Sequence, residues 1–345
     1  MRALVKYALE DGAVELRDVA PPVLEPGHVL VAARAVGVCG SDVHMWRNAQ
    51  SWDITLPLVL GHETAGVIAA VADDVTGWRV GDRVVCETAA TICGVCALCR
   101  TGRYNLCPQR EGYGAKRDGA FGELLLAQPR VLHRIPDTVG FEQAAMTEPY
   151  AVAYTAVVER ADINPGDLVV VQGAGTIGQL TAQMARLRGA GTVVMLGTAI
   201  DTARLATARE LGVDHAIDIT SEDAGALVRG LGDGLGAHVV IDATGVSVAL
   251  RQGLDLVRPY GTIVKVGWGP QPLGFSLDPL VAKAVTLAGS FSHTWSTWEA
   301  VLSLFASGRL ETDRVLGGVY PLEEWREAFE AMESGRNIKS VMVFS

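Results

Sequence analysis

A glycine-rich turn between an apolar run and a helical stretch is the feature of this sequence that most constrains its fold. Residues 168–171 read Leu-Val-Val-Val, and Gly173–Gly178 follow in the order Gly-Ala-Gly-Thr-Ile-Gly. Glycines at these spacings allow a tight turn and let the following helix pack closely on the strand. The sequence therefore predicts a strand–turn–helix unit, the usual opening of a doubly wound α/β domain.

Strand and helix patterns continue to alternate after this turn. We predict strands at Val193–Leu196, Ala216–Asp218, His238–Asp242 and Thr262–Val266. Helical stretches separate them, among which are Ala203–Leu211 and Val248–Val257. Mostly apolar strands separated by helices are typical of a parallel sheet that is covered on both faces. Residues 151–295 are therefore predicted to form one doubly wound parallel-sheet domain.

The rest of the chain has a different pattern, and 345 residues are more than one hydrophobic core usually serves. Residues 1–150 contain short β-rich runs, such as His28–Ala32 and Ala65–Val71, between glycines and prolines. The tail carries two helical patterns and a short strand, at Trp298–Ser307, Leu322–Ser334 and Ser340–Phe344. We expect a mostly β first domain over residues 1–150, completed by residues 296–345.

Composition and charge exclude several classes of protein. Hydrophobic residues make up 49% of the chain and charged residues 20%, which is typical of an ordered globular protein. The formal net charge of −10 argues against a protein that binds nucleic acid through a basic face. The N-terminus lacks an apolar stretch of signal-peptide length, and no window approaches about 18 uncharged apolar residues. We expect a soluble cytoplasmic protein with no nucleic-acid or membrane partner.

Four of the six cysteines are close together in the sequence. Cys93, Cys96, Cys99 and Cys107 follow the pattern Cys-x2-Cys-x2-Cys-x7-Cys. In a reducing cytosol this spacing indicates a metal site rather than disulfides. Four thiolates complete a tetrahedral shell around zinc and leave no open position. The predicted zinc site is therefore structural, and it orders a lobe that has little hydrophobic core of its own.

Three residues that are far apart in the sequence indicate a second metal site. Cys39 lies in Gly-Val-Cys-Gly-Ser, His62 in Gly-His-Glu-Thr-Ala-Gly, and Glu148 in Thr-Glu-Pro. Each of them alone could be a core residue. Together they offer a soft, a borderline and a hard ligand, and such a set leaves one zinc position for water or an alcohol oxygen. We predict a catalytic zinc at this site.

The glycine turn also predicts a phosphate-binding site. A helix that begins near Thr176 presents unpaired backbone N–H groups and the positive end of its dipole to an anion. Gly173, Gly175 and Gly178 let a pyrophosphate approach the backbone, and Thr176 and Ile177 open the helix. The predicted ligand is a nicotinamide dinucleotide; the alternative is a glycine-rich turn without a ligand.

The acid that usually binds the ribose hydroxyls of NAD is not at its usual place. The second predicted strand ends at Leu196, and the first acid after it is Asp201. If Asp201 reaches the ribose, the cofactor is NAD; alternatively, Thr198 and Arg204 accept a 2′-phosphate, and the cofactor is NADP. Asp201 is equally suited to cap a helix. We favour NAD.

With these motifs in this order, the chain resembles the zinc-containing medium-chain dehydrogenases, particularly the sorbitol, polyol and threonine dehydrogenase branch. The resemblance covers essentially the whole length, from the Cys39 loop and Gly61-His62-Glu63 to Glu148-Pro149 and the glycine turn. It implies a GroES-like β-barrel catalytic domain and a Rossmann cofactor domain. It also implies that Glu63 and Glu148 lie at the catalytic zinc, which Glu63 binds directly or through water in different states.

The resemblance further implies a reaction. Zinc lowers the pKa of a substrate hydroxyl, and the nicotinamide takes the hydride. Ser41 corresponds to the hydroxyl that accepts the alcohol proton, and His44 to a histidine that passes it to solvent through the ribose. Ser41 could instead cap a helix that starts near Asp42, and His44 could be an ordinary surface or core residue. Asp42 could orient a metal ligand. Val266 and Phe291 complete the residues assigned to the cofactor.

One segment departs from the polyol branch. That branch carries an Arg-Tyr pair after a Gly-x-Phe near the substrate, whereas here Gly289-Ser290-Phe291 is followed by Ser292-His293. The charged partner for a polyhydroxyl chain is missing, which puts sorbitol itself in doubt.

Two pairs of large side chains have open roles. Met45 and Trp46 follow the Cys39 loop and either form an apolar pocket wall, which suits a secondary alcohol or diol, or pack in the core. Trp295 and Trp298 could line the substrate site or an oligomer contact.

These observations favour an enzyme that transfers hydride from a secondary alcohol (a polyol, diol or sugar-derived alcohol) to NAD(P) and gives a ketone. One alternative is an L-threonine 3-dehydrogenase-like activity on a β-hydroxy amino acid, which needs a positive group near the carboxylate. The other is a non-catalytic relative, against which the intact set argues: Cys39, Ser41, His62, Glu63 and Glu148. By analogy with relatives, we expect a homotetramer or homodimer.

Overall fold

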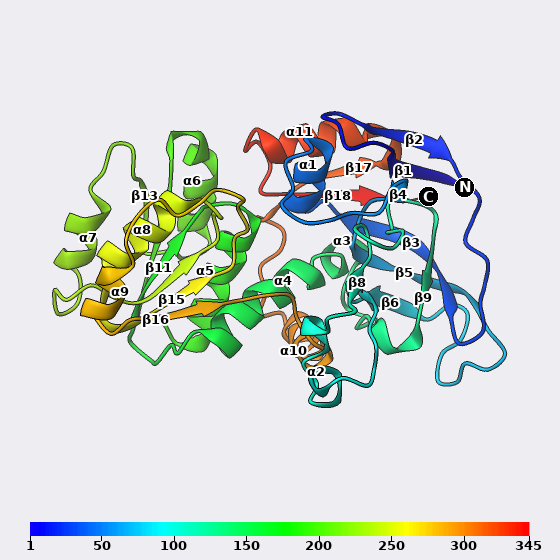
Figure 1. Ribbon diagram of the computed structural model, residues 1–345, viewed down its shortest axis with the longest axis horizontal. Coiled ribbons are helices and arrows are strands. Elements are labelled where there is room, and N and C mark those ends of the chain that lie inside the picture. The colour runs from blue at the N-terminus through cyan, green and yellow to red at the C-terminus, as the bar shows by residue number, and fades with distance from the viewer. Residues whose placement is uncertain (345) are drawn as a thin grey trace. The chain divides into compact units, whose positions relative to one another are not determined.

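The computed structural model describes residues 1–344, and the chain forms two compact units (Figure 1). One unit is residues 1–148 with the tail from His293, and the other is Pro149–Ser292. The boundaries between the two units fall between residues 148 and 149 and between residues 292 and 293.

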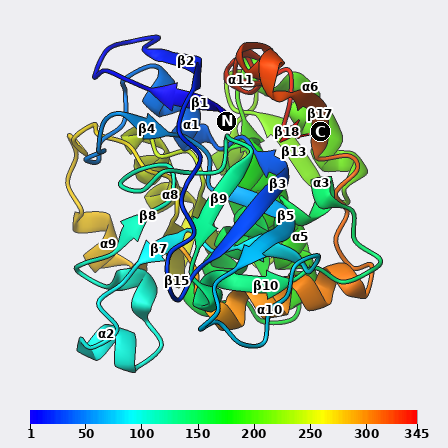
Figure 2. The same cartoon turned by 90° about the vertical axis from the view of Figure 1, so that its right-hand side faces the viewer.

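A mostly antiparallel sheet forms the frame of the first unit. Its strand order is β10-β6-β5-β3-β18-β17, and β9 also pairs with β3, so that β3, β5 and β9 lie side by side (Figure 2). The bounds are β3 Val29–Gly37, β5 Glu63–Val71, β6 Arg83–Cys86, β9 Leu124–Ala127, β10 Leu132–Arg134, β17 Leu316–Pro321 and β18 Lys339–Val343. Because β18 pairs with β3, the last strand of the chain belongs to the same sheet as strands from the first part of the unit.

Smaller elements complete this unit. They are a three-stranded sheet of order β2-β1-β4, a pair of strands β7 and β8, and five short or medium helices. Their bounds are β1 Arg2–Lys6, β2 Val14–Asp18, β4 Leu58–Val59, β7 Ala89–Thr91, β8 Glu111–Gly112, α1 Gly40–Trp46, α2 Ala97–Arg100, α3 Phe141–Ala144, α10 Trp295–Ala306 and α11 Trp325–Glu333.

An aromatic cluster fixes α1 against α11 in the core of the first unit. The ring of Trp46 lies 5.9 Å from the rings of both Trp325 and Phe329, edge to face in each case. Met45 and Trp46 are each 1% exposed. Of the two roles left open for this pair, packing is the correct one, because neither side chain reaches a surface that a substrate could touch.

The second unit is a doubly wound parallel sheet, as predicted. Its strand order is β13-β12-β11-β14-β15-β16, with all five neighbouring pairs parallel. The strands are β11 Leu168–Gln172, β12 Thr192–Gly197, β13 His215–Asp218, β14 Ala237–Asp242, β15 Val257–Lys265 and β16 Thr286–Gly289. The order reverses at β11, between β12 and β14, and α/β sheets bind dinucleotides at such a reversal.

Helices pack along this sheet. They are α5 Thr176–Arg188, α6 Thr202–Glu210, α7 Ala224–Gly230, α8 Ser247–Leu256 and α9 Asp278–Ala282, and α4 Thr147–Tyr154 leads into the unit. The predicted helices Ala203–Leu211 and Val248–Val257 are α6 and α8, each shifted by one residue. β16 and β17 escaped prediction because one is a short edge strand and the other reads Leu-Gly-Gly-Val-Tyr-Pro, which lacks a strand pattern.

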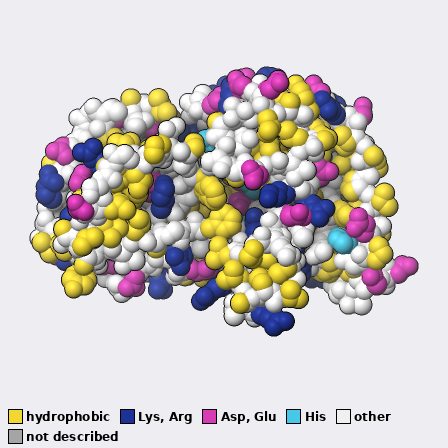
Figure 3. All heavy atoms as spheres, in the orientation of Figure 1, with side chains coloured by type: hydrophobic (Ala, Val, Ile, Leu, Met, Phe, Trp, Pro, Cys, Tyr) yellow, Lys and Arg dark blue, Asp and Glu magenta, His cyan; other side chains and the backbone are white. Residues whose placement is uncertain are grey.

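The surface carries mixed charge. On the face drawn in Figure 3, Lys and Arg side chains are interspersed with Asp and Glu. Within residues 1–344, no helix has the length and apolar character that a membrane crossing requires.

Candidate metal centre and cofactor site

The four cysteines of the predicted lobe converge on one point. The sulfurs of Cys93, Cys96, Cys99 and Cys107 all lie within 4.8 Å of one another, and those of Cys93 and Cys99 are 3.9 Å apart. Four thiolates at a Zn–S distance of about 2.3 Å stand about 3.8 Å apart at the corners of a tetrahedron. All six cysteines are free thiols, so no disulfide competes for these sulfurs.

The electrostatics of the lobe also suit a cation. Hydrogen bonds from the backbone of Val95 and Cys96 lower the pKa of Cys93 to about 6. Burial, together with the neighbouring thiols of Cys96 and Cys107, raises the pKa of Cys99 to about 12. Four thiols this close cannot all ionise without a positive charge among them, and a bound zinc ion supplies that charge.

Buried polar contacts attach the lobe to the sheet. The Tyr104 hydroxyl donates to Glu87, 2.9 Å from Oε1 and 2.8 Å from Oε2. Glu87 is fully buried, and its Oε1 is also 3.1 Å from Nε2 of His133 on β10. Burial and the charge of Glu87 raise the pKa of Tyr104, so this hydroxyl remains a donor.

The second candidate site begins at the N-terminus of α1. Cys39 is the N-cap of this helix, and its backbone N–H donates to Asp42 Oδ2 at 2.9 Å. The helix therefore starts at Gly40, and the suggestion that Ser41 caps it is wrong. The other oxygen of Asp42 lies 3.7 Å from Nδ1 of His62, so a carboxylate faces one ring nitrogen and the other is left for a metal. Burial lowers the pKa of His62, but Asp42 and Cys39 outweigh it and hold the pKa well above its usual value.

Glu63 joins Cys39 and His62 in a compact set. One ligand atom from each of the three lies within 4.8 Å of the others. Glu63 forms a buried ion pair with Lys339 of β18, whose Nζ also donates to the carbonyl of Val38 at 2.8 Å. Oε1 of Glu63 has no hydrogen-bond partner within residues 1–344. A thiol, an imidazole and an orphaned buried carboxylate oxygen together fit a bound cation.

Glu148 lies beside this set but outside its 4.8 Å limit. It is the second residue of α4, 7% exposed, and its Oε1 is 3.1 Å from Nε2 of His293. Burial raises the pKa of Glu148, but His293 and His62 lower it more, so the group is a carboxylate at neutral pH. Burial lowers the pKa of the part-buried Arg110, and the negative charge of Glu148 acts to raise it.

Ser41 and His44 lie on α1 beside the metal set. They are three residues apart, so their side chains share one face of the helix. Ser41 is half-buried and His44 is exposed. This arrangement leads from the half-buried Cys39 toward solvent.

The glycine turn has the predicted form. β11 ends at Gln172, Gly173 has a φ of +100°, and α5 begins at Thr176 with Gly175 as its N-cap. A Cβ on Gly178 would stand 1.8 Å from the carbonyl oxygen of Gly173, whereas one on Gly175 would meet nothing within 4 Å. Gly178 is therefore required for packing, and Gly175 leaves the backbone open to a ligand.

Asp201 holds the loop after β12 together. Its Oδ2 accepts hydrogen bonds from N and Oγ1 of Thr198, at 3.0 and 3.1 Å, and its Oδ1 lies 3.1 Å from Nη1 of Arg204. Thr198 is the N-cap of the short 3-10 helix Ala199–Asp201, and the Asp201 side chain completes the capping box. Thr198, Asp201 and Arg204, the three candidates for the ribose contact, form one cluster. Asp201 pairs with the guanidinium group of Arg204, to which a 2′-phosphate would have to bind.

Val266 and Phe291 follow β15 and β16, so both lie beyond the carboxyl ends of parallel strands. Val266 is 8% exposed, and Phe291 has its ring 5.8 Å from that of Trp268. The carboxyl ends are the side of such a sheet on which ligands bind.

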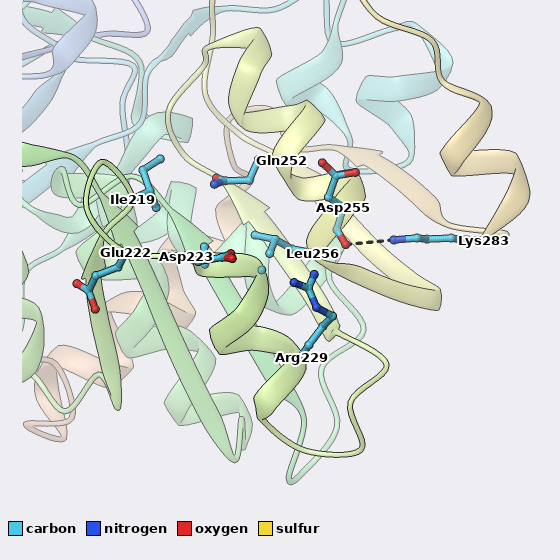
Figure 4. A pocket seen from close by; sticks show the side chains of 10 residues that line it. Ile219, Glu222, Asp223, Arg229, Gln252, Asp255, Leu256 and Lys283 are labelled. Carbon is cyan, nitrogen blue, oxygen red and sulfur yellow. Dashed lines mark hydrogen bonds between the residues drawn. The ribbon is translucent and has the colours of Figure 1, made fainter.

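A separate hollow on the second unit contains none of the predicted site residues. Ile219, Glu222, Asp223, Arg229 and Gln252 are among its lining (Figure 4). Its lysine, Lys283, donates to the backbone carbonyls of Leu254, Asp255 and Val257. That lysine closes the C-terminus of α8, and its role is structural.

Two family models match two separate stretches of the chain. Residues 25–137 match the alcohol dehydrogenase GroES-like domain, and residues 176–307 match the zinc-binding dehydrogenases. The chain is 39% identical to a sorbitol dehydrogenase of Halalkalibacterium halodurans, over 99% of each chain. The chain belongs to the zinc-dependent medium-chain dehydrogenase family. The dehydrogenase is also 34% identical to a D-arabitol-phosphate dehydrogenase of Enterococcus avium, over 100% of this chain and 97% of the other.

A solved structure gives the same picture of the dehydrogenase fold. A zinc-binding dehydrogenase from Sinorhizobium meliloti, bound to NADP, superposes with a TM-score of 0.90 at 28% identity, and the match covers 99% of each chain. The dehydrogenase is thus a zinc-dependent, NAD(P)-linked oxidoreductase of the alcohol and polyol type.

Sequence reasoning missed two residues of the dehydrogenase site and misjudged a third. Lys339 contacts Glu63 of the metal set, and His293 contacts Glu148 beside that set. The signal for Lys339 was a lysine at the start of the end strand, which reads Lys-Ser-Val-Met-Val. Trp298 is fully buried and donates to His293 at 2.6 Å, so it lies in neither a substrate-site lining nor an oligomer contact.

Removing the charge of Lys339 is expected to destabilise the dehydrogenase. Both side chains of the Lys339–Glu63 pair are 1% exposed, and a buried charge without its partner costs about 3–5 kcal/mol. We expect Lys339→Met to lower the free energy of unfolding in urea by about that amount. Glu323→Gln, which breaks the exposed pair with Arg2, is the control and should cost less than ~1 kcal/mol. Equal losses in the two variants would contradict the buried-pair interpretation.

Proposed function

We propose that this chain oxidises a secondary hydroxyl of a polyol, diol or sugar-derived alcohol to a ketone, with transfer of hydride to NAD(P). The observation that carries the proposal is the compact set of Cys39, His62 and Glu63, with the orphaned and buried carboxylate oxygen of Glu63, next to Glu148. The proposal assigns residues 1–150 with 296–345 to a catalytic domain and residues 151–295 to a cofactor domain.

In this proposal each residue at the catalytic metal site has a distinct task. Cys39, His62 and Glu148 would hold the zinc, and Glu63 would bind it directly or through water. When bound, zinc lowers the pKa of a substrate hydroxyl, and the nicotinamide accepts the hydride. Asp42 orients His62 from the side of Nδ1, at 3.7 Å.

Ser41 and His44 are proposed to move the substrate proton. The Ser41 hydroxyl would accept the proton, and His44 would pass it on to solvent. Their common face on α1 supports this order, because Ser41 is half-buried and His44 is exposed.

We propose two zinc ions per subunit, one catalytic and one structural. The two separate groups of ligand-type side chains support this number. The structural ion would be held by Cys93, Cys96, Cys99 and Cys107, whose sulfurs converge as closed sites require.

The substrate class is proposed from the relatives and from one departure. A sorbitol dehydrogenase and a D-arabitol-phosphate dehydrogenase are among the similar proteins, which favours a polyhydroxyl or related secondary alcohol. Ser292-His293 stands where the polyol branch has its Arg-Tyr pair, which favours diols and shorter alcohols over sorbitol itself.

A substrate panel tests the proposed function. Polyols, polyol phosphates, vicinal diols, simple secondary alcohols and L-threonine would be supplied with NAD and with NADP, and reduced nicotinamide followed by absorbance. The proposal expects turnover on secondary alcohols or diols, with a ketone as product. Turnover confined to L-threonine would move the assignment to the β-hydroxy amino acid alternative. No turnover by zinc-loaded, cofactor-binding protein would favour the non-catalytic alternative.

We propose NAD as the favoured cofactor, because Asp201 pairs with Arg204 and so opposes a 2′-phosphate. Asp201→Ala removes the carboxylate that pairs with Arg204. The ratio of kcat/KM with NAD to kcat/KM with NADP is expected to fall about tenfold or more, which corresponds to ~1.4 kcal/mol. Adding Arg204→Ala to this variant should reverse the gain with NADP. An unchanged ratio in Asp201→Ala would contradict the assignment of this cluster to the ribose.

Two glycine substitutions separate cofactor binding from packing. Gly175→Ala adds a methyl group where the protein leaves open space, so stability should hold while NADH affinity falls at least about tenfold. Gly178→Ala forces a Cβ against the Gly173 carbonyl and should lower the melting temperature as well. NADH fluorescence titration and thermal unfolding measure the two effects. Wild-type NADH affinity in Gly175→Ala would contradict binding at this turn.

We also propose that the protein is a cytoplasmic homotetramer or homodimer. Its binding partner is a small-molecule alcohol, the substrate. β16 is an edge strand of the second sheet, and exposed apolar side chains lie on and beside it, Leu287 at 39% and Val281 at 76% exposure. Such an edge is typically covered in native proteins. Six free thiols suit a reducing compartment. Light scattering after gel filtration measures the subunit number, and a monomer would contradict the proposal.

A further inference from the structure

A chain of two buried hydrogen bonds ends on Glu148. The indole Nε1 of Trp298 donates to Nδ1 of His293 at 2.6 Å, and Nε2 of His293 lies 3.1 Å from Oε1 of Glu148. His293 is 2% exposed and Trp298 is fully buried. We propose that His293, set by Trp298, is a positioning residue that fixes the orientation of Glu148 toward the metal. This inference rests on the proposed function, because it assumes that Glu148 serves the catalytic zinc.

The direction of both hydrogen bonds follows from the chemistry of the groups. An indole N–H can only donate, so Nδ1 of His293 must be the acceptor and carry no proton. The ring proton of neutral His293 therefore lies on Nε2, where it can be donated to Glu148. Trp298 thus selects the one neutral tautomer that binds a carboxylate.

Contacts on the other side of the indole keep Trp298 in place. The rings of His133 and Trp298 are stacked, with centroids 5.5 Å apart and planes 9° from parallel. His133 is itself held at both ring nitrogens, by Glu87 at 3.1 Å and Glu299 at 2.6 Å. Since His133 cannot shift without breaking these bonds, Trp298 presents its N–H at a fixed point.

The consequence for Glu148 is a carboxylate with one oxygen already bound. Oε1 accepts from His293, so Oε2 is the oxygen left to face a metal or a metal-bound water. Partners that orient a metal ligand typically change metal affinity or activity about 10–100-fold when they are removed. The geometry therefore assigns His293 an effect on zinc affinity without any contact between His293 and zinc.

Two substitutions at His293 separate the role of its donor from its role in packing. Glutamine places an amide N–H near the position of Nε2 and can still donate to Glu148. Asparagine ends near the position of Nδ1, so it can accept from Trp298 but cannot reach Glu148. Trp298→Phe keeps an aromatic ring against His133 and removes the indole donor, together with the volume of one fused ring. Trp295→Phe is the matched control, because Trp295 also lies 5.5 Å from His133 and is not bonded to His293.

The readouts are zinc affinity at the Cys39 site, by competition with a coloured chelator, and the visible spectrum of the cobalt-substituted protein. We expect His293→Asn to lower zinc affinity about 10–100-fold and to shift the cobalt bands, with Trp298→Phe changed in the same direction. His293→Gln should stay within about threefold of wild type, and Trp295→Phe should match it.

Equal behaviour of His293→Asn and His293→Gln, whether both are near wild type or both are impaired, would overturn the inference. If the proposed function itself fails, the result is different. The wild-type protein and Cys39→Ser would then bind the same amount of zinc, whichever residue is at position 293.

Discussion

Cys39→Ser is expected to lower turnover by a factor on the order of 10³ or more while the protein remains folded. Serine nearly preserves the volume of Cys39 but is a poor zinc ligand compared with a thiolate. The site would then retain His62 and the carboxylates Glu63 and Glu148, without the soft ligand that favours zinc. Without zinc, the substrate hydroxyl keeps its ordinary high pKa, and hydride departure from it is slow.

Metal content and kinetics check this prediction together. The variant should hold one zinc fewer per subunit and show a lower kcat with an unchanged melting profile. Cys86→Ser is the matched control, because Cys86 is a buried free thiol outside both groups of ligand-type side chains. A Cys39→Ser protein with more than about a tenth of wild-type turnover would remove Cys39 from the catalytic site.

Cys99→Ser is expected to release the other zinc and to unfold the cysteine lobe locally. Structural zinc sites contribute apparent binding free energies of about 10–16 kcal/mol, which fold segments that have no core of their own. α2 has no buried residue of its own, so packing alone cannot hold it. We expect loss of one zinc per subunit, a lower melting temperature and rapid proteolysis between residues 93 and 107.

Limited proteolysis with mass spectrometry locates the effect of Cys99→Ser. Cleavage should start in the lobe, while the parallel sheet of residues 168–289 stays protected. Cys86→Ser again serves as the control and should resist cleavage like the wild type. A variant that keeps both zinc ions and an uncut lobe would contradict the closed four-thiolate site.

The fold was largely predictable because its signals are local. The run at 168–171 with the glycines after it predicted β11, its turn and α5, and the alternation beyond gave the parallel sheet. β17 was not predictable, because its Leu-Gly-Gly-Val-Tyr-Pro sequence has no periodicity and its position depends on pairing with β18.

The site was predictable only where residue types form motifs. Cys39, His62 and the four clustered cysteines carry recognisable neighbours in the sequence. Lys339 and His293 do not, because each acts through a contact with a residue that is far away in the chain. Trp46 was ambiguous for a related reason: only tertiary packing against Trp325 decides that it is a core residue.

The most direct test of the central claim is to follow metal content and turnover together while a chelator removes zinc and added zinc restores it. The account predicts that turnover with a secondary alcohol falls in step with the loss of one zinc per subunit. It also predicts that turnover returns when that zinc is restored, and that Cys39→Ser cannot be restored. Full turnover by protein whose Cys39 site has lost its zinc would contradict the account.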